Sequence, residues 1–218
     1  MSRNVKISAA LIGVFVAVVL VMILGPASDE EGDVPKIDAA DALVVRDSSH
    51  RLGEAAADGK VTLVEFLDFE CEACGAYFPY VEQLREKYAG KVTFVARYFP
   101  LSGHFNGERA ARAAQAAAQQ DRFEDMYEQL FTTQEAWGER QVPADDTFRG
   151  YAEQLGLDMA RYDADYAAPA TLDRIRVDQA DGNALGVNST PTFFLNGEKL
   201  ENNGPDGLDA AISDALDQ

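Results

Sequence analysis

Two apolar runs in the first half of the chain have the pattern of strands buried on both faces. Val61–Phe66 is apolar except for a threonine and a glutamate, and Val92–Phe99 is rich in valine and aromatic residues. Such runs are typical of strands in a sheet that helices cover on both sides. Tyr77–Tyr88 lies between them with helical periodicity, which predicts a right-handed crossover joining two parallel strands. Ala42–Arg46 is a further short segment that we expect to be a strand.

The second half of the chain is helical before strand character returns. Apolar positions recur at helical spacing without a longer repeat, which predicts an all-helical insertion at about residues 104–186. Thr192–Leu195 has strand character, and Asn196–Gly197 is a strong signal for a two-residue hairpin turn. Asp206–Leu216 has the spacing of an amphipathic helix. The order of elements predicts an α/β fold with a helical insertion on one side of the sheet.

The amino-terminal segment has the length and polarity of a membrane anchor. Residues 7–25 carry no charge, and as a helix they would span roughly 28 Å, close to the thickness of a bilayer core. The two cations of residues 1–6 place that end in the cytoplasm by the positive-inside rule. We therefore expect a single-pass anchor, a linker at residues 26–36 and an extracytoplasmic domain at residues 37–218. The alternative is a cleaved signal sequence, which would leave the domain secreted.

The strong acidity of the chain excludes some classes of partner. The formal net charge is −18, and a surface of this sign repels the phosphates of nucleic acids. It also repels anionic lipid head groups, apart from the predicted anchor. We therefore expect no nucleic-acid binding, and membrane association only through residues 7–25.

The chain has two cysteines, Cys71 and Cys74, and they lie in a single CxxC segment. Cys71 follows the first buried strand and opens the predicted helix, where unpaired backbone N–H groups and the helix dipole favour a thiolate. Cysteines in such places have pKa values of roughly 3.5–7.5. We expect Cys71 to be the exposed nucleophile and Cys74 the buried thiol that forms or resolves the disulfide.

Two non-catalytic interpretations of the cysteine pair are weaker. A structural zinc site needs about four ligands, and His50 and His104 are the other soft ligands, without the spacing of a zinc finger. A structural disulfide here would close a very short loop and stabilise little. His104 is expected in a surface loop, with a place near the cysteines as the alternative. We expect neither a metal nor a cofactor.

Two segments together resemble a known family. Val64–Cys74 contains the CxxC, and Ser189–Phe194 contains a Thr-Pro just before the predicted hairpin. This arrangement resembles the DsbA-like branch of the thioredoxin superfamily, from about residue 37 to the end of the chain. The resemblance implies a thioredoxin-like fold with a helical insertion, and disulfide exchange as the activity.

The resemblance also implies roles for three further residues. Pro191 matches the cis-proline that faces the active-site disulfide, and Thr190 would offer backbone groups to an extended substrate. Glu65 matches a buried acid that assists proton transfer at Cys74. From the residues alone, a carboxylate in a buried strand should have a raised pKa, unless it lies at an edge facing water. Arg97, on the neighbouring strand, is the expected partner of Glu65.

One departure from the family pattern bears on reactivity. Many relatives have proline and then histidine or tyrosine between the cysteines, whereas this chain has Glu72 and Ala73. With Asp68 and Glu70 this puts three carboxylates near Cys71, and negative neighbours disfavour a thiolate. We therefore predict a Cys71 pKa in the upper part of the usual range, and a weaker oxidant. The alternative is that these side chains point into water and are screened.

The sequence thus predicts an extracytoplasmic thiol-disulfide oxidoreductase that exchanges disulfides with exported proteins, with oxidation as the first expectation. A membrane redox partner would recycle the pair. The alternatives are a disulfide reductase, for example in cytochrome maturation, and a tethered binding or chaperone module without redox activity.

Overall fold

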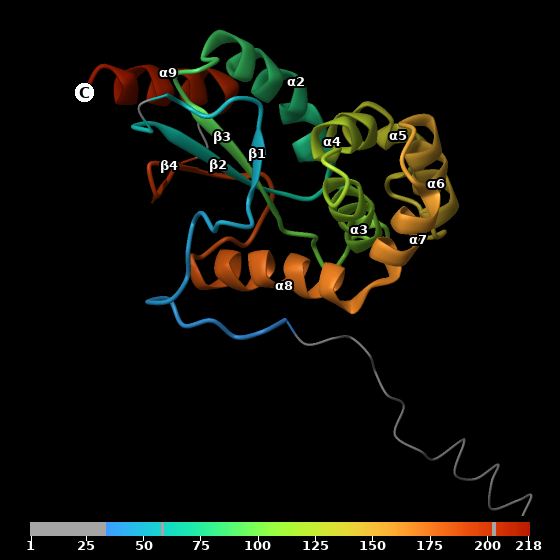
Figure 1. Ribbon diagram of the computed structural model, residues 1–218. Coiled ribbons are helices and arrows are strands. Elements are labelled where there is room, and N and C mark those ends of the chain that lie inside the picture. The colour runs from blue at the N-terminus through green and yellow to red at the C-terminus, as the bar shows by residue number, and fades with distance from the viewer. Residues whose placement is uncertain (1–33, 58, 202–203) are drawn as a thin grey trace, which may run out of the picture. The chain divides into compact units, whose positions relative to one another are not determined.

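A five-stranded mixed sheet lies at the centre of the protein (Figure 1). The computed structural model describes residues 34–57, 59–201 and 204–218. The strand order is β1-β3-β2-β4-β5, in which β2 and β3 are parallel and every other pair is antiparallel. The predicted parallel pair and the hairpin are confirmed. The strands are β1 (His50–Leu52), β2 (Thr62–Leu67), β3 (Thr93–Tyr98), β4 (Thr192–Leu195) and β5 (Glu198–Lys199).

Helices cover both faces of this sheet and extend beyond one end (Figure 1). α2 and α9 lie on one face and α8 lies on the other. α3 to α7 form a helical lobe beside the sheet, so the predicted helical block divides into this lobe and the sheet-covering α8. The helices are α2 (Glu72–Lys87), α3 (Gly107–Ala118), α4 (Phe123–Thr132), α5 (Gln134–Trp137), α6 (Asp145–Gln154), α7 (Met159–Ala167), α8 (Pro169–Ala184) and α9 (Gly204–Leu216).

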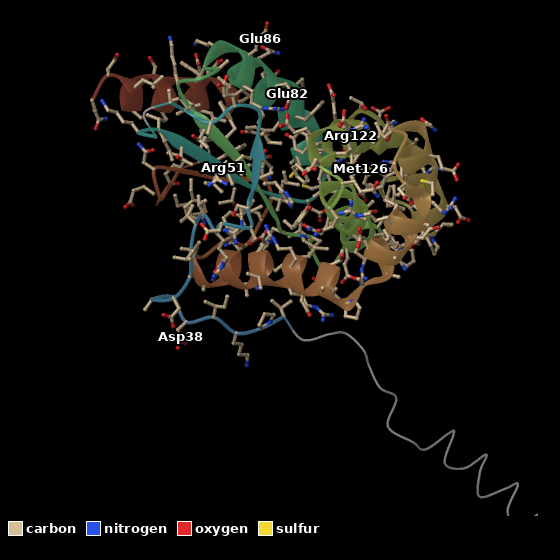
Figure 2. The ribbon with its side chains drawn as sticks, viewed as in Figure 1. Asp38, Arg51, Glu82, Glu86, Arg122 and Met126 are labelled. Carbon is tan, nitrogen blue, oxygen red and sulfur yellow. The ribbon has the colours of Figure 1, made fainter. Side chains whose placement is uncertain are left out.

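Burial follows the helix and strand periods. In α2 the buried side chains include Cys74 and Leu84, whereas Glu86 lies on the exposed side, and Met126 of α4 is fully buried inside the lobe (Figure 2). α8 approaches the sheet closely at Gly182, where a Cβ would lie 2.7 Å from the Phe99 ring. A larger residue there would require the Phe99 ring or the helix to shift.

The register of β2 and β3 separates two side chains that we expected to pair. Glu65 lies opposite Ala96, and Phe66 lies opposite Arg97. Because successive side chains of a strand alternate between faces, Glu65 lies on the α2 face and Arg97 on the α8 face. The predicted Glu65–Arg97 pair is therefore wrong.

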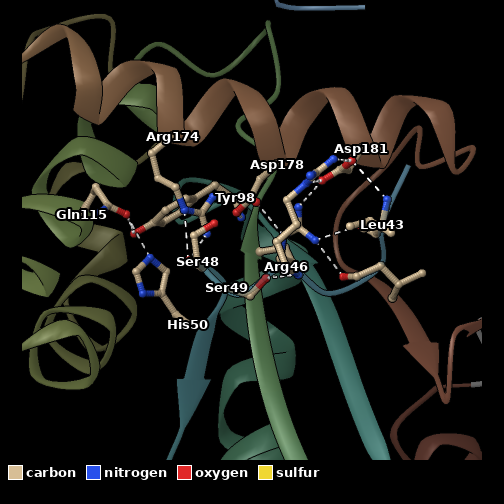
Figure 3. A network of polar contacts seen from close by, with 12 residues as sticks. Leu43, Arg46, Ser48, Ser49, His50, Tyr98, Gln115, Arg174, Asp178 and Asp181 are labelled. Carbon is tan, nitrogen blue, oxygen red and sulfur yellow. Dashed lines mark hydrogen bonds and ion pairs between the residues drawn. The ribbon is translucent and has the colours of Figure 1, made fainter. Parts of the chain in front are cut away.

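Arg97 instead lies at the centre of a buried ionic network. Figure 3 labels Asp178, Asp181, Arg46 and Arg174 of this network. Its guanidinium donates to Asp178 at 2.6 Å and to Asp181 at 2.6 Å, and all three side chains are completely buried. Arg46 also contacts Asp181, at 2.5 Å, and Arg174 contacts Asp178, at 2.6 Å. The network joins the segment before β1 to β3 and α8.

The predicted strand at Ala42–Arg46 is also wrong, because side chains satisfy its backbone. The Leu43 N–H donates to Asp181 at 3.2 Å, and Arg97 donates to the carbonyl oxygens of Leu43 and Val44 at 2.9 and 2.8 Å. A segment bonded in this way has no need of a neighbouring strand. The sheet instead begins with β1.

The predicted membrane anchor, residues 7–25, lies outside the described residues. Within the described part, none of the helices combines the length and the apolar character required to cross a membrane.

Candidate active site

Cys71 and Cys74 occupy the amino-terminal end of α2, as the sequence predicts. β2 ends at Leu67, and a turn closed by the Cys71 N–H and the Asp68 carbonyl, 3.1 Å apart, leads into the helix. Cys71 is the N-cap residue. It is 8% exposed, so the expectation of an exposed nucleophile is wrong, whereas Cys74 is 0% exposed and buried as expected. Both are free thiols. Among the described residues, no cluster of three or more histidine, cysteine or acidic side chains could hold a metal ion.

The two thiols have opposite electrostatic environments. The pKa of Cys71 is lowered to about 5, and the hydrogen bond from the Cys74 thiol lowers it most. Burial of Cys71 opposes this effect. Hydrogen bonds from the Thr190 side chain and from the N–H groups of Cys74 and Ala73 lower the pKa further. Burial raises the pKa of Cys74 well above its ordinary value, and its bond to Cys71 and the negative charge of Glu65 add to this. One sulfur is therefore a thiolate at neutral pH and the other is a thiol.

The loop before β4 completes the site from the far end of the chain. The Thr190–Pro191 peptide bond is cis. The Thr190 carbonyl oxygen lies 3.4 Å from Cys71 Sγ and accepts a hydrogen bond from Cys71 when that cysteine is protonated. The buried Thr190 hydroxyl has no hydrogen-bond partner in the described part of the chain. It is thus free to donate to the Cys71 thiolate.

Glu65 lies in β2, on the face of the sheet that α2 covers, and Cys74 belongs to α2. It is 5% exposed, and its pKa is raised to about 8, mainly by burial and further by the negative charges of Glu82 and Cys71. The expectation of a buried acid with a raised pKa is confirmed. Such a group can hold a proton at neutral pH and release it to a neighbouring sulfur.

Replacing Glu65 by glutamine is expected to flatten the pH dependence of stability in the oxidised protein. Burial raises the folded-state pKa of Glu65 to about 8. The contribution of protonated Glu65 to the free energy of unfolding is therefore fully present below its unfolded-state pKa. This contribution is lost as the pH rises through about 8, at about 1.4 kcal/mol per pH unit. Urea unfolding of the oxidised wild-type protein and the oxidised Glu65→Gln variant, at pH 5 and pH 8, measures the difference. An equal loss of stability between pH 5 and pH 8 in the two proteins would contradict the raised pKa of Glu65. Oxidation removes the titration of Cys71, which has the opposite sign.

The predicted effect of the nearby carboxylates on Cys71 is wrong. Asp68 accepts from the N–H groups of Leu101 and Glu70, at 2.8 and 2.9 Å, and from His104 Nδ1 at 2.6 Å. It is 1% exposed, so water does not screen it. Its charge is instead met by donors inside the protein.

Glu70 is held in the same manner. It accepts from the N–H groups of Asn106 and Glu139, at 2.5 and 3.1 Å, and burial raises the pKa of its carboxyl. Glu72 is exposed to water. The Cys71 pKa of about 5 consequently lies in the lower half of the usual range rather than in its upper part.

Sequence reasoning missed Gln134, which lies at the start of α5. Its Nε2 donates to the carbonyl oxygens of Phe69 and Cys71, at 2.7 and 2.9 Å. It thereby ties the active-site turn to the helical lobe. A Cβ at Gly75 would lie 2.2 Å from Gln134 Oε1, so the glycine after Cys74 leaves room for this contact. Gln134 is 63 residues from Cys71, and no local pattern points to it.

Replacing Gly75 by alanine is expected to displace Gln134 and remove its two bonds, a loss of about 1 kcal/mol each. In a Gln134→Ala background the same substitution should stabilise α2 by up to about 1 kcal/mol, because alanine is the better helix former. Urea unfolding of the two single variants and the double variant measures this change of sign. Additive effects would contradict the contact.

Two open grooves flank the start of α2. One, of about 360 Å³, is lined by residues that include Tyr77, Pro191 and Phe193. The other, of about 650 Å³, lies between α2 and the lobe and includes Glu72 and Gln134.

Comparisons with known proteins agree with this site. A sequence model described as thioredoxin matches residues 46–214. A thioredoxin-like oxidoreductase from Silicibacter pomeroyi DSS-3 superposes with a TM-score of 0.65 and 27% identity, over 82% of this chain and 98% of that one. Wolbachia pipientis α-DsbA1 superposes with a TM-score of 0.69 and 19% identity, over 80% of this chain and 94% of that one. Bacillus subtilis BdbD superposes with a TM-score of 0.68 and 21% identity, over 78% of this chain and 94% of that one. The last two show likeness of fold.

Curated relatives are much longer proteins. A Na⁺/H⁺ antiporter NhaA from Herminiimonas arsenicoxydans is 38% identical over 143 residues, which is 66% of this chain and 22% of that protein. Another NhaA antiporter, from Mycobacterium sp. (strain KMS), is 36% identical over 145 residues, which is 65% of this chain and 23% of that protein. The chain thus spans about a fifth of their length. Because the thioredoxin match covers most of the chain and includes the CxxC and the cis-proline, the chain belongs to the thioredoxin family, with the fold of its DsbA-like thiol-disulfide oxidoreductases.

Proposed function

We propose that the chain is an oxidase that donates the Cys71–Cys74 disulfide to cysteine pairs in exported proteins. The observation that carries the proposal is the opposite pKa shift of the two thiols. A stabilised Cys71 thiolate favours the reduced form of the pair, and a pair that is stable when reduced is a strong oxidant.

The chemistry proceeds by two exchanges. A client thiolate attacks Cys71 Sγ, the Cys71–Cys74 bond breaks, and the Cys74 sulfur leaves with the electron pair and takes a proton. Glu65, which raises the pKa of Cys74, supplies that proton. A second client thiolate then attacks the client sulfur, and Cys71 leaves as a stable thiolate. The client loses two electrons, and the cysteine pair of the oxidase gains them.

Recognition of the client follows from the groups around Cys71. The Thr190 carbonyl lies 3.4 Å from Cys71 Sγ, so backbone groups of this loop can pair with an extended client segment. The groove lined by Tyr77, Pro191 and Phe193 would take its apolar side chains. These contacts select an unfolded segment rather than a particular sequence.

The proposed location is the extracytoplasmic side of the membrane, with residues 7–25 as the anchor. The uncharged run and the cations before it support this. A membrane redox partner would accept two electrons from the reduced pair. In this setting the client is a newly exported protein with free cysteines.

The proposal of an oxidase rather than a reductase is supported by the donors that hold Asp68 and Glu70, because these carboxylates then leave the Cys71 pKa low. To test the direction, oxidised chain is mixed with a reduced peptide that contains two cysteines, at pH 7, and both forms of the peptide are followed to equilibrium. We expect the peptide disulfide to predominate. An equilibrium in which the peptide stays reduced would support the reductase instead.

A further inference from the structure

His104 lies beside the active-site turn, although it follows β3 in the sequence. Its Nδ1 is 2.6 Å from Asp68 Oδ2. The histidine side chain is 20% exposed and the Asp68 side chain is 0% exposed. The contact is therefore a short, charge-assisted bond, shielded from water on the carboxylate side.

Asp68 is the residue around which the active-site turn closes. Its Oδ1 accepts from the Glu70 N–H at 2.9 Å, and its carbonyl accepts from the Cys71 N–H at 3.1 Å. A rotation of the Asp68 side chain would loosen the turn immediately before the nucleophile. His104 and the Leu101 N–H, at 2.8 Å, hold the other carboxylate oxygen and prevent that rotation.

The charge of Asp68 also has to be balanced. A buried carboxylate with no cation beside it would repel a thiolate on Cys71. Four acidic groups face His104: Asp68, Glu70 and Cys71 from the turn before α2, and Glu139, whose Oε1 lies 3.9 Å from Nε2. The bond to Asp68 raises the pKa of His104 to about 9 against the effect of burial, and the charges of Asp68, Cys71 and Glu70 add to this. The ring is thus a cation from pH 5 to pH 8.

We propose that His104 is a positioning residue for Cys71, which cancels the charge of Asp68 and so permits the thiolate on which the oxidase proposed above depends. The inference rests on that proposed function and adds a residue to it. His104 acts through Asp68 and through its charge, without contact with the client.

Linkage gives a test in the unaltered protein. If protonated His104 stabilises the thiolate, the thiolate must raise the pKa of His104 by the same amount. In the disulfide form Cys71 carries no charge, so we expect the pKa of His104 to be about one unit higher in the reduced protein. NMR titration of the histidine ring protons from pH 5 to pH 10, in both redox forms, measures the difference.

The second histidine is an internal control. His50 stacks on Phe123, with ring centroids 3.9 Å apart, and its Nε2 contacts Gln115 at 3.0 Å. Burial lowers its pKa to about 3, so it should not titrate in this range in either form. Equal pKa values of His104 in the two redox forms would overturn the inference.

A His104→Gln variant gives the reciprocal measurement. Glutamine keeps an N–H donor for Asp68 and removes the charge. We expect the Cys71 pKa, from thiolate absorbance, to rise by about one unit, and the reduction potential to fall by about 30 mV, the equivalent of a tenfold change. Arg149→Gln is the matched control, since it removes one positive charge from an exposed pair in α6 and should leave both values unchanged.

The outcomes separate the two proposals. A reversible cysteine couple with a wild-type Cys71 pKa in His104→Gln would overturn the role of His104 and leave the oxidase proposal standing. The absence of a reversible couple in the wild-type chain would overturn both. A rise in the Cys71 pKa in His104→Gln but not in Arg149→Gln would support the inference.

Discussion

Replacing Cys71 by serine should abolish disulfide exchange, whereas replacing Cys74 by serine should trap it halfway. Cys71 is the sulfur that forms a thiolate, with a pKa of about 5. In Cys74→Ser this thiolate can still attack a disulfide peptide, but no second sulfur releases the peptide. The variant should therefore accumulate a covalent adduct of one peptide per chain, which mass spectrometry of the intact protein detects.

The chain itself offers a clean control for this experiment. It has two cysteines, so the double serine variant has no thiol that could form an adduct. Adducts on Cys71→Ser with none on Cys74→Ser would mean that the roles of the two sulfurs are reversed. Full biological activity of Cys71→Ser would point instead to the binding or chaperone module.

Replacing Arg97 by methionine is expected to destabilise the fold by about 3–5 kcal/mol, because it leaves two buried carboxylates without their shared cation. Asp178 and Asp181, which Figure 3 labels, each lie 2.6 Å from this guanidinium, and both side chains are completely buried. For a domain of this size the loss corresponds to a fall in Tm of roughly 6–20 °C. Thermal unfolding followed by circular dichroism measures it.

The same substitution at an exposed arginine is the matched control. Arg149→Met removes bonds to Glu153 and Asp163 that are about half exposed, and should cost about 0–1 kcal/mol.

Burial opposes ionisation of Asp181, but the bonds from Arg46 and Arg97 hold its pKa below the ordinary value. This stability is present at neutral pH and is lost as the pH falls through the folded-state pKa. Equal losses in Arg97→Met and Arg149→Met would contradict a structural role for the network.

The elements that local patterns specify could be predicted from the sequence. The apolar runs of β2 and β3 and the Asn196–Gly197 turn have short-range signals, and φ is +51° at Asn196 and +88° at Gly197, as a two-residue turn of this type requires. The CxxC at a helix start and the Thr-Pro before the hairpin each have a local signature. These two local signatures identify both parts of the site, the CxxC and the Thr190–Pro191 loop, although the sequence does not show that the two parts are in contact.

The contacts that decide reactivity have no local signature. The sequence places Asp68 and Glu70 beside Cys71, but whether they destabilise the thiolate depends on donors from Leu101, His104 and Asn106, more than 30 residues away. A buried charge has the effect that its partners allow, and the partners are set by the fold. The prediction of a high Cys71 pKa failed because it counted neighbours in sequence rather than in space.

The most direct test of the account is the reduction potential of the Cys71–Cys74 pair, measured by equilibrating the purified chain with glutathione. A Cys71 pKa of about 5 lies about 1.5 units above that of the strongest oxidants, whose potential is about −120 mV. At about 30 mV per unit, we expect a value of roughly −165 mV. A value near −270 mV, as in thioredoxin, would contradict the account and make the protein a reductase.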